Sequence, residues 1–159
     1  NIIIKALKNN NKIIFCGNGG SAADSQHLAA ELMGRYKLNR DPLAAMSLTV
    51  DTSAITAIGN DYGYDKVFSR QLEGIGNKND VLYATSTSGA SKNVIEAAKK
   101  AKDLGIYVIG VTGENNAELS DLSDVSINAP SKETNHIQEM HIAIGQLICG
   151  IVENYFFEK

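Results

Sequence analysis

The sequence has no tryptophan, only two prolines and two cysteines, and fewer basic than acidic residues, 15 against 18 in 159 positions. The net charge of −3 at pH 7 argues against nucleic acid or an anionic membrane surface as the main partner, because both select clustered positive charge. Cys16 and Cys149 lie far apart in apolar runs, which favours reduced, buried thiols over a disulfide framework. No apolar run approaches the roughly 18 residues of a membrane span and no secretory signal is recognised, so a soluble, cytoplasmic protein is expected.

What the chain does contain is an alternation of short apolar runs with longer segments of helical period. This pattern is typical of parallel strands joined by crossover helices, and it predicts one α/β domain over residues 1–159 with a five-stranded parallel sheet flanked by helices. The chain opens on Asn1 already in a helical pattern, so we expect that a preceding helical segment is missing. Strands are expected near 12–16, 44–48, 81–85, 106–111 and 125–127, and helices over 21–33, 52–58, 65–74, 91–104, 117–122 and 134–156.

The last expected helix is apolar on more than one face. A helix of this kind must be enclosed by its own domain or by partner subunits, so the pattern suggests a homo-oligomer. The apolar positions are Ile137, Met140, Ile142, Ile144, Leu147, Ile148, Ile151 and Val152.

A glycine-rich segment follows the first expected strand and reads Cys16-Gly17-Asn18-Gly19-Gly20-Ser21. Glycines let backbone amides approach a ligand, and the start of the next helix adds partial positive charge suited to phosphate or sugar hydroxyls. The spacing is not the GxGxxG of dinucleotide-binding proteins. A tight turn with Ser21 as N-cap explains the same residues without a ligand.

A second segment, rich in hydroxyl groups, follows the third expected strand and reads Ala84-Thr85-Ser86-Thr87-Ser88-Gly89-Ala90-Ser91. Hydroxyls beside backbone amides can hold a phosphate dianion without a large fixed positive charge. A serine-rich loop with one capping serine is the structural alternative. Because both loops follow strands of one sheet, a shared ligand pocket is the favoured interpretation.

Two sets of polar residues on helices are further candidates. His27 and Glu31 are four residues apart on one helix face, where they can bind a divalent metal or act as a base with its orienting partner. An ordinary surface contact is the alternative. In the last helix, Gln138 is a candidate pocket residue, whereas His141 is expected to be a satisfied structural histidine.

Together these segments resemble the SIS domain family of sugar-phosphate proteins, and within it the phosphoheptose isomerases. The sequence STSG is typical of the wider family, whereas the His27/Glu31 pair and the Asn60-Asp61 step narrow the resemblance to that branch. The similarity runs from about Lys12 to Val152. It includes the glycine loop, HLAAELMGRY from His27, AIGNDYG from Ala57, SRQLEGIG from Ser69, STSGAS from Ser86 and IQEMH from Ile137.

The resemblance implies a flavodoxin-like three-layer sandwich and a cytoplasmic homotetramer. It also implies zinc as cofactor and the interconversion of sedoheptulose 7-phosphate and glycero-manno-heptose 7-phosphate, for the heptose of bacterial lipopolysaccharide. Glu31 would be the base and a metal ligand, His27 and Gln138 would be further metal ligands, and Arg35 would be an active-site arginine. The implied sugar contacts are Asn18, Gly19, Gly20, Ser21, Asn60, Asp61 and Gln138, and the implied phosphate contacts are Ser86, Thr87, Ser88 and Ser91.

One position departs from that branch, which carries a histidine eight residues after the glutamine as metal ligand and acid. This chain has Gln146 there. Eight residues of helix rotate by about 80° net, so Gln138 and Gln146 are expected to face one pocket. The resemblance implies that both would be metal-binding, catalytic residues there. Gln146 cannot exchange a proton near neutral pH, and His141 points about 140° away from it around the helix.

This departure keeps two other functions open. Another SIS group shares the IQEMH helix, lacks the second histidine and binds the bacterial replication initiator without catalysis. A sugar-phosphate sensor without chemistry is the second alternative. The presence of both His27 and Glu31 favours the enzyme.

Overall fold

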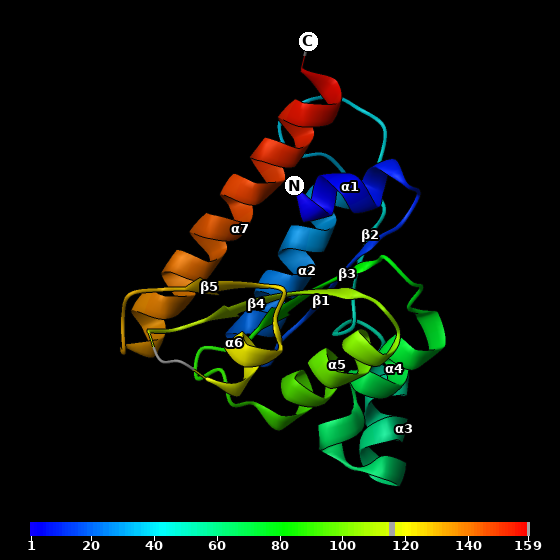
Figure 1. Cartoon of the computed structure of the whole chain (residues 1–159), viewed down its shortest axis with the longest axis vertical. Helices are drawn as coiled ribbons and strands as arrows, with labels where there is room; N and C mark the ends of the chain where they lie inside the picture. The colour runs from blue at the N-terminus through cyan, green and yellow to red at the C-terminus, as the bar shows by residue number, and fades with distance from the viewer. Residues whose placement is uncertain (115–116, 159) are drawn as a thin grey trace.

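A five-stranded sheet organises the fold in the computed structural model, which describes residues 1–114 and 117–158 (Figure 1). All neighbouring strands are parallel, and their order is β2-β1-β3-β4-β5. In flavodoxin-like sheets of this order the ligand binds beyond the carboxyl ends of the strands, where the order reverses between β1 and β3. The strands are β1 (Ile13–Cys16), β2 (Ala45–Ser47), β3 (Val81–Thr85), β4 (Tyr107–Thr112) and β5 (Val125–Asn128).

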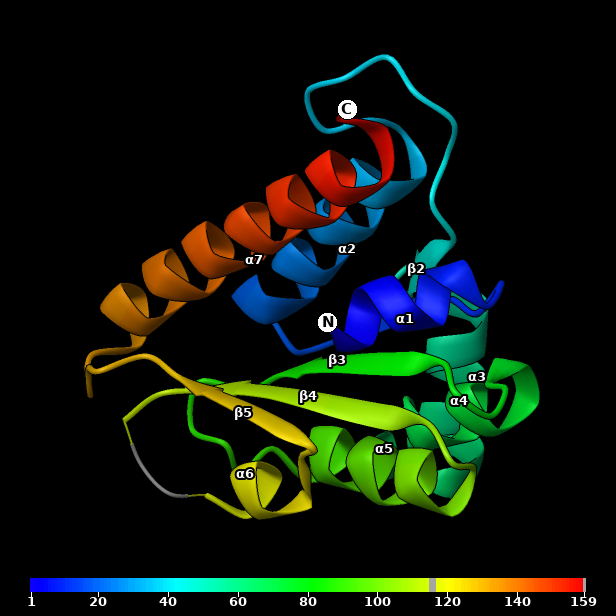
Figure 2. The same ribbon diagram turned by 45° about the horizontal axis from the view of Figure 1, so that its top comes forward.

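Helices cover both faces of the sheet, which gives the expected three layers (Figures 1 and 2). One face carries α1 (Ile2–Lys8), α2 (Gly20–Met33) and α7 (Thr134–Phe157). The other carries α3 (Thr52–Tyr62), α4 (Ser69–Ile75), α5 (Lys92–Asp103), α6 (Glu118–Leu122) and the short 3₁₀ turn η1 (Tyr64–Lys66). Every residue of β1 and β3 is buried, as expected for central parallel strands covered on both faces.

The sequence prediction was wrong in detail between residues 52 and 75. The helix expected to end at residue 58 continues to Tyr62, and the single helix expected over 65–74 is a 3₁₀ turn followed by α4. Gly63 separates α3 from the η1 turn, because its φ of +89° is a left-handed conformation that glycine adopts without strain. Tyr64 is the first residue of the η1 turn that follows.

The sequence predicts no apolar run long enough to cross a membrane, but the last helix, α7, passes that test when judged by length and composition alone. In the fold it packs with one face on α2 and the sheet, where Cys149 and Val152 are buried. Its other face exposes Leu147 (63 %), Ile151 (53 %) and Tyr155 (49 %). The described chain therefore covers α7 on one side only, and an apolar stripe at four-residue spacing remains on the surface.

Candidate functional site

The glycine loop and the hydroxyl loop lie side by side, because they follow the paired strands β1 and β3 at the point where the strand order reverses. Two hydrogen bonds connect the glycine loop to the first turn of α5, which directly follows the hydroxyl loop. Nδ2 of Asn18 donates to Oδ1 of Asn93 at 2.8 Å, and Nδ2 of Asn93 donates to Oδ1 of Asn18 at 2.8 Å. The two segments chosen from the sequence are thus neighbours at the expected edge of the sheet.

The glycine loop turns sharply into α2. Gly19, with a φ of +54°, occupies the N-cap position, so the alternative in which Ser21 caps the helix is wrong. Ser21 is instead buried, and its carbonyl accepts a hydrogen bond from Oγ of Ser25. A Cβ atom at Gly20 would lie 2.7 Å from Nε2 of Gln138, so only glycine lets the α7 glutamine approach the loop this closely.

In the hydroxyl loop, three serine side chains converge. Oγ of the buried Ser86 donates to Oγ of Ser91 at 3.0 Å and lies 3.4 Å from Oγ of Ser88. Ser91 precedes α5 but makes no side-chain capping bond there, so the alternative of a capping serine is not observed. A cavity of about 190 Å³ adjoins the loop, lined by Thr87, Ser88, Gly113, Glu114, Ser131, Lys132, Thr134 and Ile137.

The His27/Glu31 pair meets Gln146 between α2 and α7. Nε2 of His27 lies 3.0 Å from Oε1 of Glu31 and 3.1 Å from Nε2 of Gln146, which is itself 3.4 Å from Oε1 of Glu31. The side chain of Glu31 is 20 % exposed and that of His27 is 52 % exposed. These three residues form an accessible cluster with one imidazole, one carboxylate and one amide.

Both glutamines of α7 contact α2, but at different points along it. Gln146 reaches the His27/Glu31 cluster, whereas the amide of Gln138 lies at Gly20, near the start of α2. Eight residues of helix also rise by about 12 Å, which an argument from rotation alone ignores. The structure therefore brings together three of the four expected metal ligands, and Gln138 lies with the glycine loop.

The cluster can accept a metal ion in terms of donor chemistry. No group of three or more histidine, cysteine, aspartate or glutamate side chains is found among residues 1–114 and 117–158. The imidazole and the carboxylate are good zinc ligands, and an amide oxygen is a weaker one. Nε2 of His27 cannot both donate to Glu31 and accept from Gln146, and either a half-turn of the Gln146 amide or a bound cation would remove this mismatch.

His141 is buried in α7, 2 % exposed, which confirms a structural position, but among the described residues only one of its ring nitrogens has a partner, so the ring is not fully satisfied, contrary to expectation. Its Nε2 lies 2.9 Å from the carbonyl oxygen of Thr112, while Nδ1 has no partner within the described part of the chain. Burial lowers the pKa of His141 below its ordinary value, although the Thr112 bond and nearby Asp24 act in the opposite direction. A neutral ring held against β4 does not replace the acid that Gln146 lacks.

Three further candidates lie apart from these clusters. Arg35 is exposed just beyond Gly34, the C-cap of α2, at the end of the helix opposite the glycine loop. Asn60 and Asp61 are exposed at the end of α3, where Nδ2 of Asn60 donates to Oδ1 of Asp61 at 2.8 Å. Sequence reasoning missed Tyr64, whose hydroxyl donates to Oδ1 of Asn18 at 3.1 Å.

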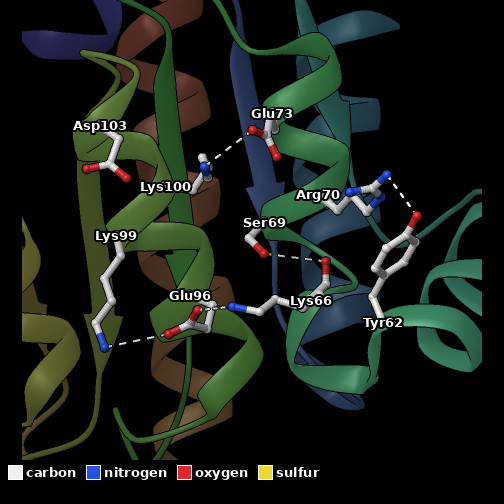
Figure 3. A pocket seen from close by; sticks show the side chains of 9 residues that line it. All are labelled: Tyr62, Lys66, Ser69, Arg70, Glu73, Glu96, Lys99, Lys100 and Asp103. Atoms are coloured by element: carbon white, nitrogen blue, oxygen red, sulfur yellow. Dashed lines mark hydrogen bonds and ion pairs between the residues drawn. The ribbon is translucent and has the colours of Figure 1, made fainter.

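A hollow of about 380 Å³ between α4 and α5 contains none of the site residues chosen from the sequence (Figure 3). Its charges are largely paired with one another: Lys66 contacts Glu96, and Nζ of Lys100 lies 3.4 Å from Oε1 of Glu73. Arg70 stacks on the ring of Tyr62, with its guanidinium carbon 3.9 Å from the ring centroid. These contacts tie the α3–α4 segment to α5 and leave little unpaired charge for a ligand.

The chain is similar to known proteins over nearly its whole length. The SIS domain model matches residues 1–113. A phosphoheptose isomerase from Akkermansia muciniphila is 55 % identical over 156 residues, which cover 98 % of this chain and 82 % of the relative.

Two solved structures share the fold. The phosphoheptose isomerase of Neisseria gonorrhoeae superposes with a TM-score of 0.91 at 46 % identity, and that of Francisella tularensis with 0.93 at 35 % identity. Each alignment covers 96 % of this chain and 82 % of the solved chain. The chain therefore belongs to the SIS domain family and, within it, to the phosphoheptose isomerase branch.

Proposed function

We propose that this protein catalyses the phosphoheptose isomerase reaction, in which sedoheptulose 7-phosphate and glycero-manno-heptose 7-phosphate interconvert through an enediol. The product would supply heptose for bacterial surface polysaccharide. One observation carries the proposal beyond the family relationship. The carboxylate of Glu31 lies on α2, the helix that begins at the glycine loop, where it contacts His27 and Gln146. A partly exposed carboxylate on the helix that leaves a ligand loop supports the role of a base toward a sugar bound at that loop.

The side chains divide the work between binding and proton transfer. The hydroxyls of Ser86, Ser88 and Ser91, with Thr87 beside them, would hold the phosphate, while Asn18 and Gln138 would contact the sugar chain. Ser21 and the backbone of Gly19 and Gly20 complete the proposed binding surface.

Glu31 would remove a proton from C1 of the ketose and return it to C2, while a second proton passes from O1 to O2. His27 and Gln146 contact the Glu31 carboxylate and would fix its orientation.

Zinc is the proposed cofactor, with His27, Glu31 and Gln146 as ligands and Gln138 as a fourth donor if its side chain reorients. When bound, zinc would polarise the carbonyl oxygen and stabilise its developing negative charge. The residues present fit this role, and the amide in place of an imidazole predicts weaker binding.

A cytoplasmic homotetramer is the proposed assembly, with neither membrane nor nucleic acid as a direct partner. The stripe of Leu147, Ile151 and Tyr155 supports it, because an exposed apolar helix face of this kind needs a cover and a second copy offers a complementary one. Arg35, Asn60 and Asp61 are proposed to reach substrate only in the assembled protein, since one chain leaves them on its surface.

A second function is favoured by one residue. Gln146 cannot exchange a proton, so a non-catalytic SIS protein that binds the replication initiator, or that senses a sugar phosphate, is the competing proposal. An assay of the purified protein with sedoheptulose 7-phosphate and with shorter ketose phosphates, each with and without zinc, separates the two. We expect zinc-dependent turnover of the seven-carbon sugar. The absence of turnover at saturating zinc would overturn the proposal that the protein is an isomerase.

A further inference from the structure

The side-chain amide of Asn18 is the meeting point of three elements. It belongs to the glycine loop after β1, it exchanges two hydrogen bonds with Asn93 in the first turn of α5, and it accepts one from Tyr64 in η1. The distances are 2.8, 2.8 and 3.1 Å. Asn93 and Tyr64 belong to neither of the two motifs that the sequence singled out.

Counting donors and acceptors shows what Asn18 has left to offer. An amide carries two N–H donors and a carbonyl oxygen with two lone pairs. Asn93 and Tyr64 occupy both lone pairs of Oδ1, and Oδ1 of Asn93 takes one of the two N–H groups. The single unused group of Asn18 is therefore one N–H, so toward a ligand this residue is a donor only.

Asn93 and Tyr64, the two hydrogen-bond partners of Asn18, differ in burial. Asn93 is 3 % exposed and sits two residues after Ser91, so its position is tied to the hydroxyl loop. Tyr64 is 59 % exposed and follows Gly63, whose φ of +89° sets the direction of the η1 turn. A buried amide and a surface hydroxyl thus fix the same oxygen from two sides.

We propose that Asn93 and Tyr64 are positioning residues that hold Asn18 so that its remaining N–H donates to an oxygen of the sugar chain. This proposal rests on the proposed function, since it assumes a sugar phosphate bound between the two loops. Through Asn93, the orientation of the sugar contact is coupled to the start of α5 and hence to the loop that holds the phosphate. The preferred ligand group at this point is an oxygen that accepts, such as a carbonyl or the lone pair of a hydroxyl.

The test is a double-mutant cycle read by binding. Calorimetry would give the Kd of sedoheptulose 7-phosphate and of inorganic phosphate for the parental protein, Asn93→Ala, Asn18→Ala and the double variant, and zinc-supported turnover would be measured beside them. We expect Asn93→Ala to weaken sugar-phosphate binding about tenfold and to leave the Kd of inorganic phosphate unchanged. In the Asn18→Ala background the same substitution should have no further effect, because its influence passes through Asn18.

Tyr64→Phe provides a variant that removes one exposed hydroxyl and leaves the core intact. It should weaken sugar-phosphate binding about threefold. The matched control is Tyr62→Phe, because Tyr62 is similarly exposed (55 %) but its hydroxyl accepts from Arg70 and makes no bond to Asn18. The control should bind as the parental protein does.

The outcomes separate this proposal from the function on which it rests. Independent effects of Asn93→Ala and Asn18→Ala, or equal affinities for Tyr64→Phe and Tyr62→Phe, overturn the positioning role even in an active isomerase. If the parental protein binds sedoheptulose 7-phosphate without isomerising it, the proposed reaction is wrong. The double-mutant cycle then still tests whether Asn93 positions Asn18. A parental protein that binds no sugar phosphate overturns both.

Discussion

Nε2 of His27 lies 3.0 Å from a carboxylate oxygen of Glu31 and 3.1 Å from the amide nitrogen of Gln146. This nitrogen carries either a proton or a lone pair, so it can serve only one of the two neighbours as a hydrogen-bond partner. A cation would accept the lone pair, and a half-turn of the Gln146 amide would present its oxygen to the same ion. The cluster thus offers the donors that the proposed zinc ion would need, and the amide at position 146 would be the weakest of its ligands.

Gln146→His should strengthen that ligand. Because imidazole binds zinc better than an amide and can also transfer a proton, we expect zinc affinity to rise by about tenfold or more and turnover to increase. Chelator competition would measure the affinity, and an isomerisation assay at saturating zinc would measure the turnover. Gln26→His is the matched control, because Gln26 precedes His27 on α2 but its side chain contacts Thr49 instead of the cluster.

A comparison of the parental protein with Gln146→His also distinguishes an isomerase from a non-catalytic regulator. Tighter zinc binding in Gln146→His without isomerisation by either form, together with binding of a replication initiator by the parental protein, would establish the regulator. Sugar contacts in a regulator need not be aligned for proton transfer, so a metal site alone would not create the reaction.

Glu31→Gln should remove nearly all turnover and leave folding and sugar-phosphate binding in place, because an amide keeps the shape of the side chain without its basicity. Initial rates, the melting temperature and the Kd of sedoheptulose 7-phosphate would be compared with the parental protein. Glu73→Gln, an exposed position on the opposite face of the sheet, serves as control and should be fully active. Undiminished turnover in Glu31→Gln would exclude Glu31 as the base.

Ser86→Ala and Ser88→Ala should each weaken ligand binding by about 1 to 2 kcal/mol, since each removes a hydroxyl from the cluster proposed to hold the phosphate. Calorimetry with sedoheptulose and with its 7-phosphate tests the assignment. Only the phosphorylated sugar should lose affinity, and Ser53→Ala on the exposed side of α3 should change neither value. Equal affinity of the parental protein for the two sugars would refute a phosphate-binding role.

Ile151→Asp should dissociate the proposed homo-oligomer, because a carboxylate in an apolar interface loses its hydration without gaining a partner. Light scattering would give the molecular mass of each form at matched concentration. Val50→Asp is the control, since Val50 is also exposed (59 %) but lies outside the α7 stripe. A parental protein that is monomeric at micromolar concentration would remove the basis for this assembly.

The sheet and most helices could be predicted because short apolar runs bounded by glycine, aspartate, asparagine or proline alternate with longer segments in which apolar residues recur at helical spacing. The two ligand loops followed from the same logic, since loops after neighbouring parallel strands meet at one edge. The end of α3 at Tyr62 and the start of α4 at Ser69 could not be predicted, because they depend on the conformation of Gly63 and on packing against α5.

The polar contacts across the fold were harder to predict than its elements. Asn93 resembles any polar residue in the first turn of a helix, and only the pairing of β1 with β3 brings it to Asn18. The separate positions of Gln138 and Gln146 depend on how α7 is placed along α2, which rotation around one helix does not determine. In the sequence, Glu153 is only a charged residue in an apolar helix, so its buried ion pair with Arg40 could not be predicted.

Glu153 is fully buried in α7 and forms the most enclosed ion pair in the described part of the chain. Its Oε2 lies 2.9 Å from Nε of Arg40, and its carboxylate also accepts from the backbone amides of Tyr36, Lys37 and Leu38. Burial alone would raise the pKa of Glu153, but these hydrogen bonds outweigh it and hold the pKa below its ordinary value. The residue thereby anchors the segment that leads from α2 to β2.

Glu153→Gln should lower the free energy of unfolding by about 3 kcal/mol at pH 7, because it leaves Arg40 buried without its counter-charge. The folded-state pKa is the lower one, so the contribution of Glu153 is fully present above the unfolded-state pKa and is lost as pH falls through the folded-state value. The difference between the two proteins should therefore shrink as pH falls below about 4.5. Urea unfolding at pH 7, 5 and 4 and at one protein concentration measures it, with Glu139→Gln on the same helix as an exposed control. A difference that stays constant across these pH values would show that the Glu153 carboxylate contributes through packing instead of charge.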